Sequence, residues 1–88
     1  MSWAYSFDDR AFKELKKLDR QVQKDILAYL DERVAGDEDP RRFGKSLHAN
    51  LAGLWRYRVG NYRILCEIKD RQLLVLVISV GHRKNVYD

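Results

Sequence analysis

The chain opens with a short alternation of apolar and polar residues, which two stretches of helical periodicity follow. Trp3, Tyr5 and Phe7 share one face of a strand predicted within residues 2–7, because successive side chains of a strand point to opposite sides. Two amphipathic helices are predicted within residues 8–19 and 19–36. Their apolar residues recur at helical spacing: Ala11, Phe12, Leu15 and Leu18, then Val22, Ile26, Leu27, Leu30 and Val34. Such a pair typically covers one face of a sheet.

The second half of the chain has the pattern of three strands. Residues 54–59 and 62–69 flank Gly60 and Asn61, a pair that favours a two-residue hairpin turn. A second turn precedes residues 73–80, whose nearly continuous apolar character predicts a central strand. The order of elements predicts an α+β fold, with a four-stranded, mostly antiparallel sheet and a two-helix hairpin packed on one face. Residues 1–88 are predicted to form a single domain.

The predicted hairpin separates an apolar face from an arginine face. If Gly60 and Asn61 form the turn, Arg58 lies opposite Arg63, and Arg56 shares their face. The other face carries only apolar or aromatic side chains: Trp55, Tyr57, Val59, Tyr62, Ile64 and Cys66. Like charges at opposed positions cost roughly 0.2–1 kcal/mol. A bound anion would relieve this repulsion, and guanidinium groups match phosphate oxygens well. The alternative is three solvated arginines whose stems cover apolar side chains.

The charge distribution agrees with an anionic partner. The net charge is +4, yet residues 1–39 carry 7 Lys and Arg against 10 Asp and Glu, whereas residues 40–88 carry 10 against 3. A basic half of this kind suggests a polyanion. The lone cysteine, Cys66, is predicted to be a buried hydrophobe in a protein of the reducing cytoplasm. No apolar run is long enough to cross a membrane, and no secretory signal is expected.

The C-terminal segment adds further candidate RNA-binding groups. Arg83 and Lys84 supply positive charge, His82 can exchange a proton near neutral pH, and Tyr87 can stack on a base. His48 is interpreted as structural, because no carboxylate or cysteine stands at ligand spacing. The chain has no phosphate-binding glycine loop, no metal-ligand motif and no motif for an organic cofactor. A ribonuclease could work without either, because the RNA 2′-OH is itself a nucleophile that arginines can assist.

The segments "LAGLWRYRVGNYRILCEI" and "LLVLVISVGHRKNVYD" resemble RelE toxins of the RelE/ParE superfamily, as do "YSFDDRAFKELKKLD" and "LHANLAG". The resemblance covers essentially the whole chain. It implies a RelE-like, microbial-RNase-like fold and a bacterial type II toxin. Such a toxin is an mRNA endonuclease that enters the A site of the 70S ribosome and leaves a 2′,3′-cyclic phosphate. A RelB-like antitoxin would inhibit it, and operator DNA would be bound only through that antitoxin.

The resemblance also implies roles for individual residues. Arg63 stands at the family's phosphate-binding arginine, Arg83 at the arginine that stabilises the transition state or leaving group, and Tyr87 at the tyrosine that stacks on the mRNA base. Arg56 and Arg58 stand where the best-studied members have two lysines. Because arginine stays charged, His82 is the expected substitute for a lysine general base. Alternatively, the site acts mainly by charge stabilisation while the ribosome positions the mRNA.

Two other functions remain compatible with the sequence. A ParE-like toxin shares this fold but inhibits gyrase by binding, without nuclease chemistry. An RNA- or antitoxin-binding module with weak catalysis is the other alternative, and the arginine-for-lysine changes favour it. The set of Arg63, Arg83 and Tyr87 favours the ribonuclease.

Overall fold

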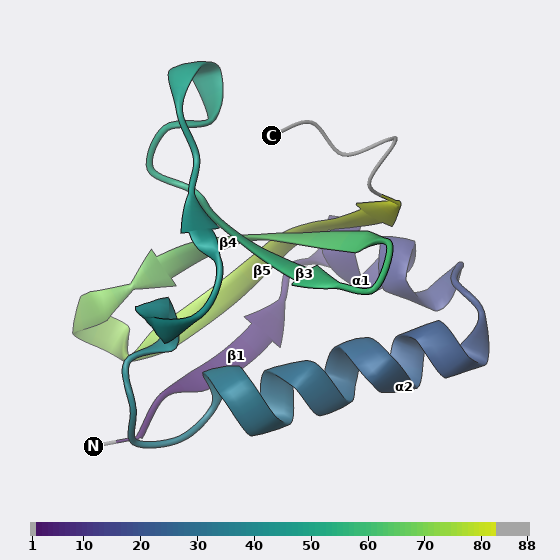
Figure 1. Ribbon diagram of the computed structural model, residues 1–88, viewed down its shortest axis with the longest axis horizontal. Coiled ribbons are helices and arrows are strands. Elements are labelled where there is room, and N and C mark those ends of the chain that lie inside the picture. The colour runs from purple at the N-terminus through teal and green to yellow at the C-terminus, as the bar shows by residue number, and fades with distance from the viewer. Residues whose placement is uncertain (1, 83–88) are drawn as a thin grey trace.

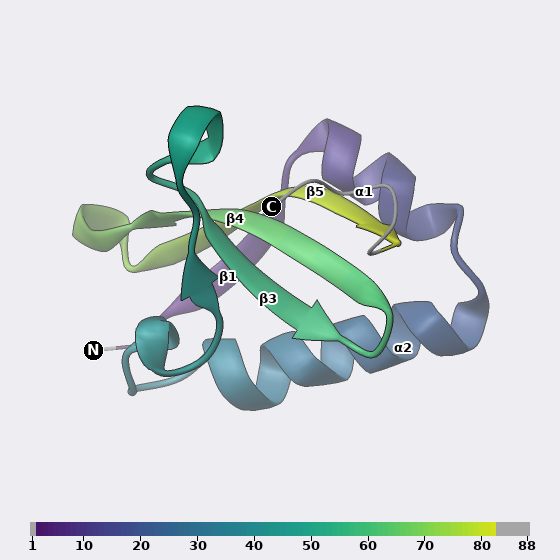
Figure 2. The same ribbon diagram turned by 45° about the horizontal axis from the view of Figure 1, so that its top comes forward.

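The computed structural model describes residues 2–82, in which two helices pack against one face of a five-stranded sheet (Figures 1 and 2). The sheet order is β1-β5-β4-β3-β2, and β1 pairs with β5 in parallel while the other pairs are antiparallel. The elements are β1 (Ala4–Phe7), α1 (Asp9–Lys16), α2 (Arg20–Tyr29), β2 (Lys45–Ser46), β3 (Trp55–Val59), β4 (Tyr62–Lys69) and β5 (Leu74–His82). The α+β class and the helical hairpin on one face are therefore confirmed.

The expectation of four strands was wrong, because β2 is a fifth. Its two residues lie between the second predicted helix and the strand predicted over residues 54–59, and they pair with β3 through Lys45 opposite Arg56 and Ser46 opposite Trp55. A two-residue strand is too short to show alternation along the sequence, so only its partner reveals it. The segment between β2 and β3 then projects from the sheet on the side away from α2 (Figures 1 and 2).

Local capping and packing explain the two helices. The Ala11 amide donates to Asp8 Oδ1 at 2.8 Å, so Asp8 is the N-cap of α1. Asp19 stands at the N-cap of α2, but its side chain makes no capping hydrogen bond. A π-helical turn over Leu30–Val34 continues α2. No helix within residues 2–82 is long and apolar enough to span a bilayer.

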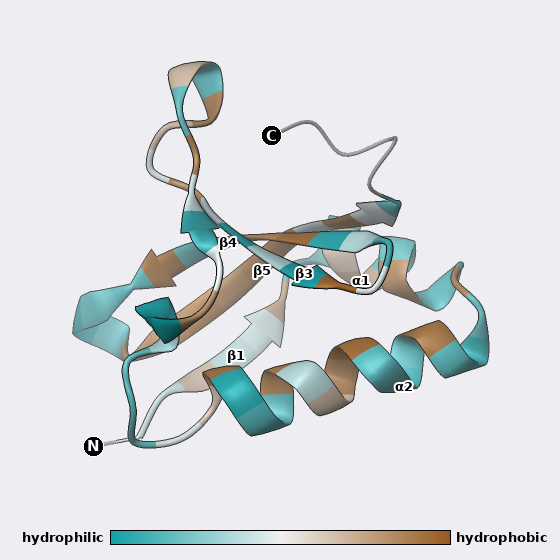
Figure 3. Ribbon diagram, in the orientation of Figure 1, coloured by the Kyte–Doolittle hydropathy of each residue, from teal (hydrophilic) through white to brown (hydrophobic). Residues whose placement is uncertain are grey.

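The hydrophobic core lies between the helices and the apolar face of the sheet. Its buried members are Ala11, Leu15, Ile26, Leu30 and Val34 from the helical segment, and Tyr57, Ile64, Cys66, Val75, Val77 and Val80 from the sheet. The apolar residues alternate with polar ones along α2 and run almost unbroken along β5 (Figure 3). Cys66 is fully buried, as predicted, and burial raises the pKa of its thiol.

The hairpin register is the predicted one. Gly60 has a φ of +59° in the turn, and the pairs Val59–Tyr62, Arg58–Arg63 and Tyr57–Ile64 follow from it. A register that differed by one residue would have moved every side chain of the strand to the opposite face. The division into an apolar face and an arginine face is therefore confirmed.

A β-bulge interrupts β5. Leu65 of β4 pairs with Ser79, and the next residue, Cys66, pairs with Val77, so Ile78 is an extra residue. Glu14 of α1 supports this irregular stretch, because its Oε1 accepts hydrogen bonds from the Val80 amide at 2.9 Å and from Ser79 Oγ at 3.2 Å. Bulges reverse the alternation of the residues beyond them, which decides where the end of β5 points.

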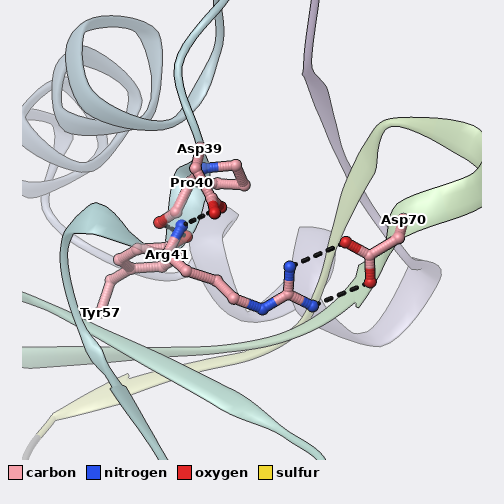
Figure 4. Close-up of polar contacts among 5 residues, drawn as sticks. All are labelled: Asp39, Pro40, Arg41, Tyr57 and Asp70. Carbon is pink, nitrogen blue, oxygen red and sulfur yellow. Dashed lines mark hydrogen bonds and ion pairs between the residues drawn. The ribbon is translucent and has the colours of Figure 1, made fainter.

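The segment that leads into β2 is fastened at two points (Figure 4). The Tyr57 hydroxyl, which is buried, donates to the Pro40 carbonyl at 2.7 Å. The Arg41 guanidinium donates to both carboxylate oxygens of Asp70, at 2.8 and 2.9 Å, and this lowers the pKa of the Asp70 carboxyl. Pro40 also begins a short helical turn, Pro40–Arg42. These contacts set the position from which the chain enters β2.

Replacing Tyr57 by phenylalanine is expected to lower the free energy of unfolding by about 1–2 kcal/mol, because a buried carbonyl then lacks its donor. Urea denaturation measures the change. Tyr29→Phe is the matched control, since the Tyr29 hydroxyl makes no hydrogen bond within residues 2–82. Its effect should stay within about 0.5 kcal/mol. Equal losses in the two variants would contradict the assigned role of the Tyr57–Pro40 bond.

Candidate functional site

The face of the sheet opposite the helices collects four cationic side chains, and we call it the basic face. Arg56 and Arg58 come from β3 and Arg63 from β4, as the alternation predicted. The structure adds Lys45, because β2 places it opposite Arg56. Residues paired across strands point to the same side. Three neighbouring strands thus direct positive charge to one surface.

The register arranges these cations in two adjacent rows. Lys45, Arg56 and Leu65 form one row, and Arg58 and Arg63 form the next. The second row continues on β5 at Gly81, which has no side chain. Within residues 2–82, β5 therefore adds no side chain to the basic face at the position opposite Arg63. Glu67 shares the face, but its carboxylate lies 4.0 Å from Lys69 Nζ, on the side away from the arginines.

The three arginines differ in burial. Arg56 is 8% exposed, Arg63 is half-buried and Arg58 is exposed. Burial lowers the pKa of the Arg56 guanidinium, and the charges of Arg58 and Arg63 lower it further. Arginine nonetheless stays protonated at neutral pH. The cluster therefore concentrates charge at a cost that a bound anion would offset.

An apolar cluster on the basic face borders the arginines. Its buried members are Leu47 and Leu65, and Leu51, Leu54 and Ile78 pack against them. The Leu47 amide donates to the Leu54 carbonyl at 3.1 Å, which closes the loop between β2 and β3 at its base. This small second core packs the loop between β2 and β3 against the sheet.

Two cavities open beside the cations and share Lys45, Arg56 and Arg58. One, of about 340 Å³, is completed by residues 46–49, including His48. The other, of about 240 Å³, is completed by Tyr29, Phe43 and Gly44. The basic face is thus hollowed at two places beside these three side chains. Concave cationic surfaces of this kind suit an extended polyanion.

The sequence reasoning missed two residues of this site. Lys45 was not singled out, because its strand is too short to be recognised by alternation. His48 was interpreted as structural, yet it lines the 340 Å³ cavity with Arg56 and Arg58. The available signal was the turn chemistry of Gly44, which precedes Lys45 and has a φ of +83°. A glycine of this kind marks a bend in the chain, but it does not show that the next residues pair with β3.

The structure does not bring His82 to the basic face. His82 pairs with Tyr62 across β4 and β5, and Tyr62 packs on the core side. The two rings meet edge-on, with centroids 5.4 Å apart. His82 also lines another cavity, of about 470 Å³, whose lining includes Arg10, Glu14 and Lys17 as well as Leu51 and Leu65 of the apolar cluster. The predicted site residues Arg83, Lys84 and Tyr87 lie outside the described residues.

The available side chains define what the basic face can do. Guanidinium groups donate paired hydrogen bonds to phosphate and stabilise charge that develops on it. Within residues 2–82, no three His, Cys, Asp or Glu side chains are grouped to hold a metal ion. The arginines of the basic face are suited to bind an anion and to polarise it.

Comparison with known proteins assigns the chain to a family. Residues 5–87 match the family described as the ParE toxin of the type II toxin–antitoxin system parDE. The protein belongs to the RelE/ParE superfamily of type II toxins. Toxin RelG of Mycobacterium tuberculosis is 36% identical over 99% of this chain and 98% of its own length. The mRNA interferase toxin RelE of Escherichia coli is 33% identical over 96% of this chain and 86% of its own length.

Solved structures of RelE-type toxins share the fold. The toxin–antitoxin complex RelBE2 of Mycobacterium tuberculosis superposes with a TM-score of 0.84 at 28% identity, over 97% of this chain and 95% of that chain. A mutant of the Escherichia coli toxin RelE in the free state gives a TM-score of 0.75 at 30% identity, over 96% and 86%. The likeness extends across the helices and the sheet that carries the basic face.

Gly44 is expected to be essential for placing Lys45 in this toxin. A Cβ at Gly44 would collide with the Arg56 carbonyl oxygen and lie 2.6 Å from Trp55 Nε1. Gly44→Ala should therefore cost about 2–4 kcal/mol of stability, from overpacking added to left-handed backbone strain. Gly60→Ala isolates the strain, since its Cβ would meet no atom within 4 Å. Thermal unfolding compares them, and an equal loss in both variants would argue against the collision.

Proposed function

We propose that this toxin is a ribosome-dependent mRNA endonuclease that cuts the codon in the A site and so inhibits translation. The observation that carries the proposal is the convergence of Lys45, Arg56, Arg58 and Arg63 on one hollowed face. The 33% identity between this chain and the mRNA interferase toxin RelE of Escherichia coli supports the proposal. Phosphodiester cleavage by RNA's own 2′-OH requires charge stabilisation, which this face can supply without a metal or organic cofactor.

The proposed mechanism assigns complementary tasks to the arginines. Arg63 and Arg58, which lie directly opposite each other, hold the scissile phosphate between them. Arg56 is nearly buried, so its guanidinium is already oriented and loses little freedom on binding. As the 2′ oxygen attacks, negative charge grows on the phosphate oxygens, and these groups stabilise it more strongly than they stabilise the substrate. The products are a 2′,3′-cyclic phosphate and a 5′-hydroxyl.

Residues beyond the described part of the chain complete the proposed site. By the resemblance, Arg83 assists the transition state or the leaving group, Tyr87 stacks on a base of the codon, and Lys84 adds a phosphate contact. We assign these roles to the same toxin domain, residues 1–88. The 70S ribosome holds the mRNA that these groups engage.

We further propose that a RelB-like antitoxin binds and inhibits this toxin. Several solved relatives are toxin–antitoxin complexes, including the RelBE complex of Escherichia coli. An antitoxin that covers or distorts the basic face would block access to mRNA. Operator DNA would then be contacted through the antitoxin, and the toxin would act in the cytoplasm.

A gyrase-directed toxin is the second candidate function. The family description that matches residues 5–87 is that of ParE, which favours this alternative. A gyrase poison needs binding but no attack on a phosphodiester. The two functions therefore differ in their products: codon-positioned mRNA cuts in one case, and broken DNA with intact mRNA in the other.

Arg63→Ala should reduce cleavage on programmed ribosomes by about 10²-fold or more, because one donor to the transition state is lost. Mapping of RNA ends by primer extension measures the rate and the position of the cut. Growth of cells that express the variant without an antitoxin should recover in parallel.

Arg71→Ala is the matched control for this experiment. It removes the same charge from an exposed turn outside the basic face, so cleavage should be unchanged. If Arg63→Ala cuts as fast as the wild type, the proposed role of Arg63 is wrong. If the wild type leaves mRNA intact and breaks DNA instead, the gyrase function replaces the ribonuclease.

A further inference from the structure

The cavity beside β2 contains a group whose chemistry differs from that of the other side chains around it. Lys45, Arg56 and Arg58, which line it, are cationic, and His48 lines it with them. Arginine and lysine hold their protons at neutral pH, whereas an imidazole can accept and release one. Among the residues that line this cavity, His48 is therefore the one suited to move a proton. This inference rests on the proposed ribonuclease function and adds a component that it lacks.

The loop fixes the backbone on both sides of His48. The preceding Leu47 is buried, and its amide donates to the Leu54 carbonyl at 3.1 Å. The His48 carbonyl accepts a hydrogen bond from the Leu51 amide at 3.1 Å. Ala49 follows with a φ of +56°, a conformation that non-glycine residues rarely adopt. A strained, anchored loop thus presents an exposed imidazole at a defined place.

The register explains why this place is relevant to the arginines. Lys45 lies opposite Arg56, and His48 follows Lys45 by three residues, at the start of the loop. Arg56 and Arg58 line the same cavity and also belong to the cluster that includes Arg63. A volume of about 340 Å³ falls at the lower end of the roughly 300–1,000 Å³ of small-molecule sites. One nucleotide unit with its phosphate fits that scale.

We propose that His48 is the general base that removes the proton from the attacking 2′-OH. His82, the histidine expected from the sequence to act here, lies on the core side of the sheet beside Tyr62. His48 lines one cavity with the cations that attract the phosphate, and the charged groups that share this lining are Lys45, Arg56 and Arg58. The carboxylate of Glu67 does not line this cavity.

The 2′ O–H bond breaks and its proton moves to a ring nitrogen of neutral His48. The electron pair left on the 2′ oxygen forms the bond to phosphorus, and the bond from phosphorus to the 5′ oxygen breaks. The 5′ oxygen takes a proton from water, and the hydroxide so formed removes the proton from the imidazolium. His48 returns to its starting state.

The test is single-turnover cleavage of mRNA on programmed ribosomes between pH 5.5 and 8.5, with the full chain. The wild-type rate should rise with pH as an imidazole loses its proton, and His48→Ala should lose about 10²-fold in rate at pH 7.5, together with that pH dependence. Added imidazole should restore part of the rate in His48→Ala. Ribosome binding should be unchanged. Asn50→Ala, an exposed residue of the same loop that does not line the cavity, should behave like the wild type.

Several outcomes would overturn the assignment. If His48→Ala keeps the wild-type rate and pH profile, or loses rate only through weaker ribosome binding, His48 is not the base. If His82→Ala removes the pH dependence and His48→Ala does not, the base is His82. A His48→Asn variant with an unchanged melting temperature guards against a folding artefact. A wild type that cuts no mRNA would refute the ribonuclease function itself, which is a different result.

Discussion

The pairing of β3 with β4 is the constraint on which the rest of the structure depends. A two-residue turn at Gly60 and Asn61 fixes the register, and the register decides which side of the sheet every later side chain faces. The same pairing buries Tyr57 against Ile64 and opposes Arg58 to Arg63. Core formation therefore enforces the arginine cluster: the repulsion is of the order of 1 kcal/mol, whereas burying two large apolar side chains contributes several times more.

The features that the sequence predicted are those encoded by neighbouring residues. Alternation along β3 and β4, helical spacing before Val34 and the Gly-Asn turn are local signals, and they yielded the layers, the hairpin and the arginine face. The features that could not be predicted from the sequence depend on contacts between residues far apart along the chain. Lys45 joins the face through a two-residue pairing with β3, and the placement of His82 depends on a bulge that Glu14 stabilises from another element. Arg83, Lys84 and Tyr87 stay predictions, because they lie outside the described residues.

With arginine at positions 56 and 58 of β3, the proposed site assigns phosphate binding and proton transfer to different residues, whereas a lysine could do both. A lysine can both attract phosphate and, once its pKa is lowered, accept a proton. Arg56 is desolvated and crowded by two like charges, and its pKa falls, yet a guanidinium still keeps its proton at neutral pH. The basic face thus specialises in electrostatics. Proton transfer then requires a separate group with a different acidity. In the proposed site this group is His48 of the loop after β2, which lines a cavity together with Arg56 and Arg58.

The extra residue in β5 gives this strand two opposite phases. Before Ile78, odd-numbered residues such as Val75 and Val77 face the core; after it, the even-numbered Val80 does so instead. A comparison that transfers site residues from one toxin to another by sequence position assumes a common phase. Wherever a relative lacks this bulge, or carries it one residue earlier or later, equivalent letters of the alignment end up on opposite sides of the sheet. Functional assignments near the end of β5 therefore need the pairing partner of each residue as well as its position in the alignment.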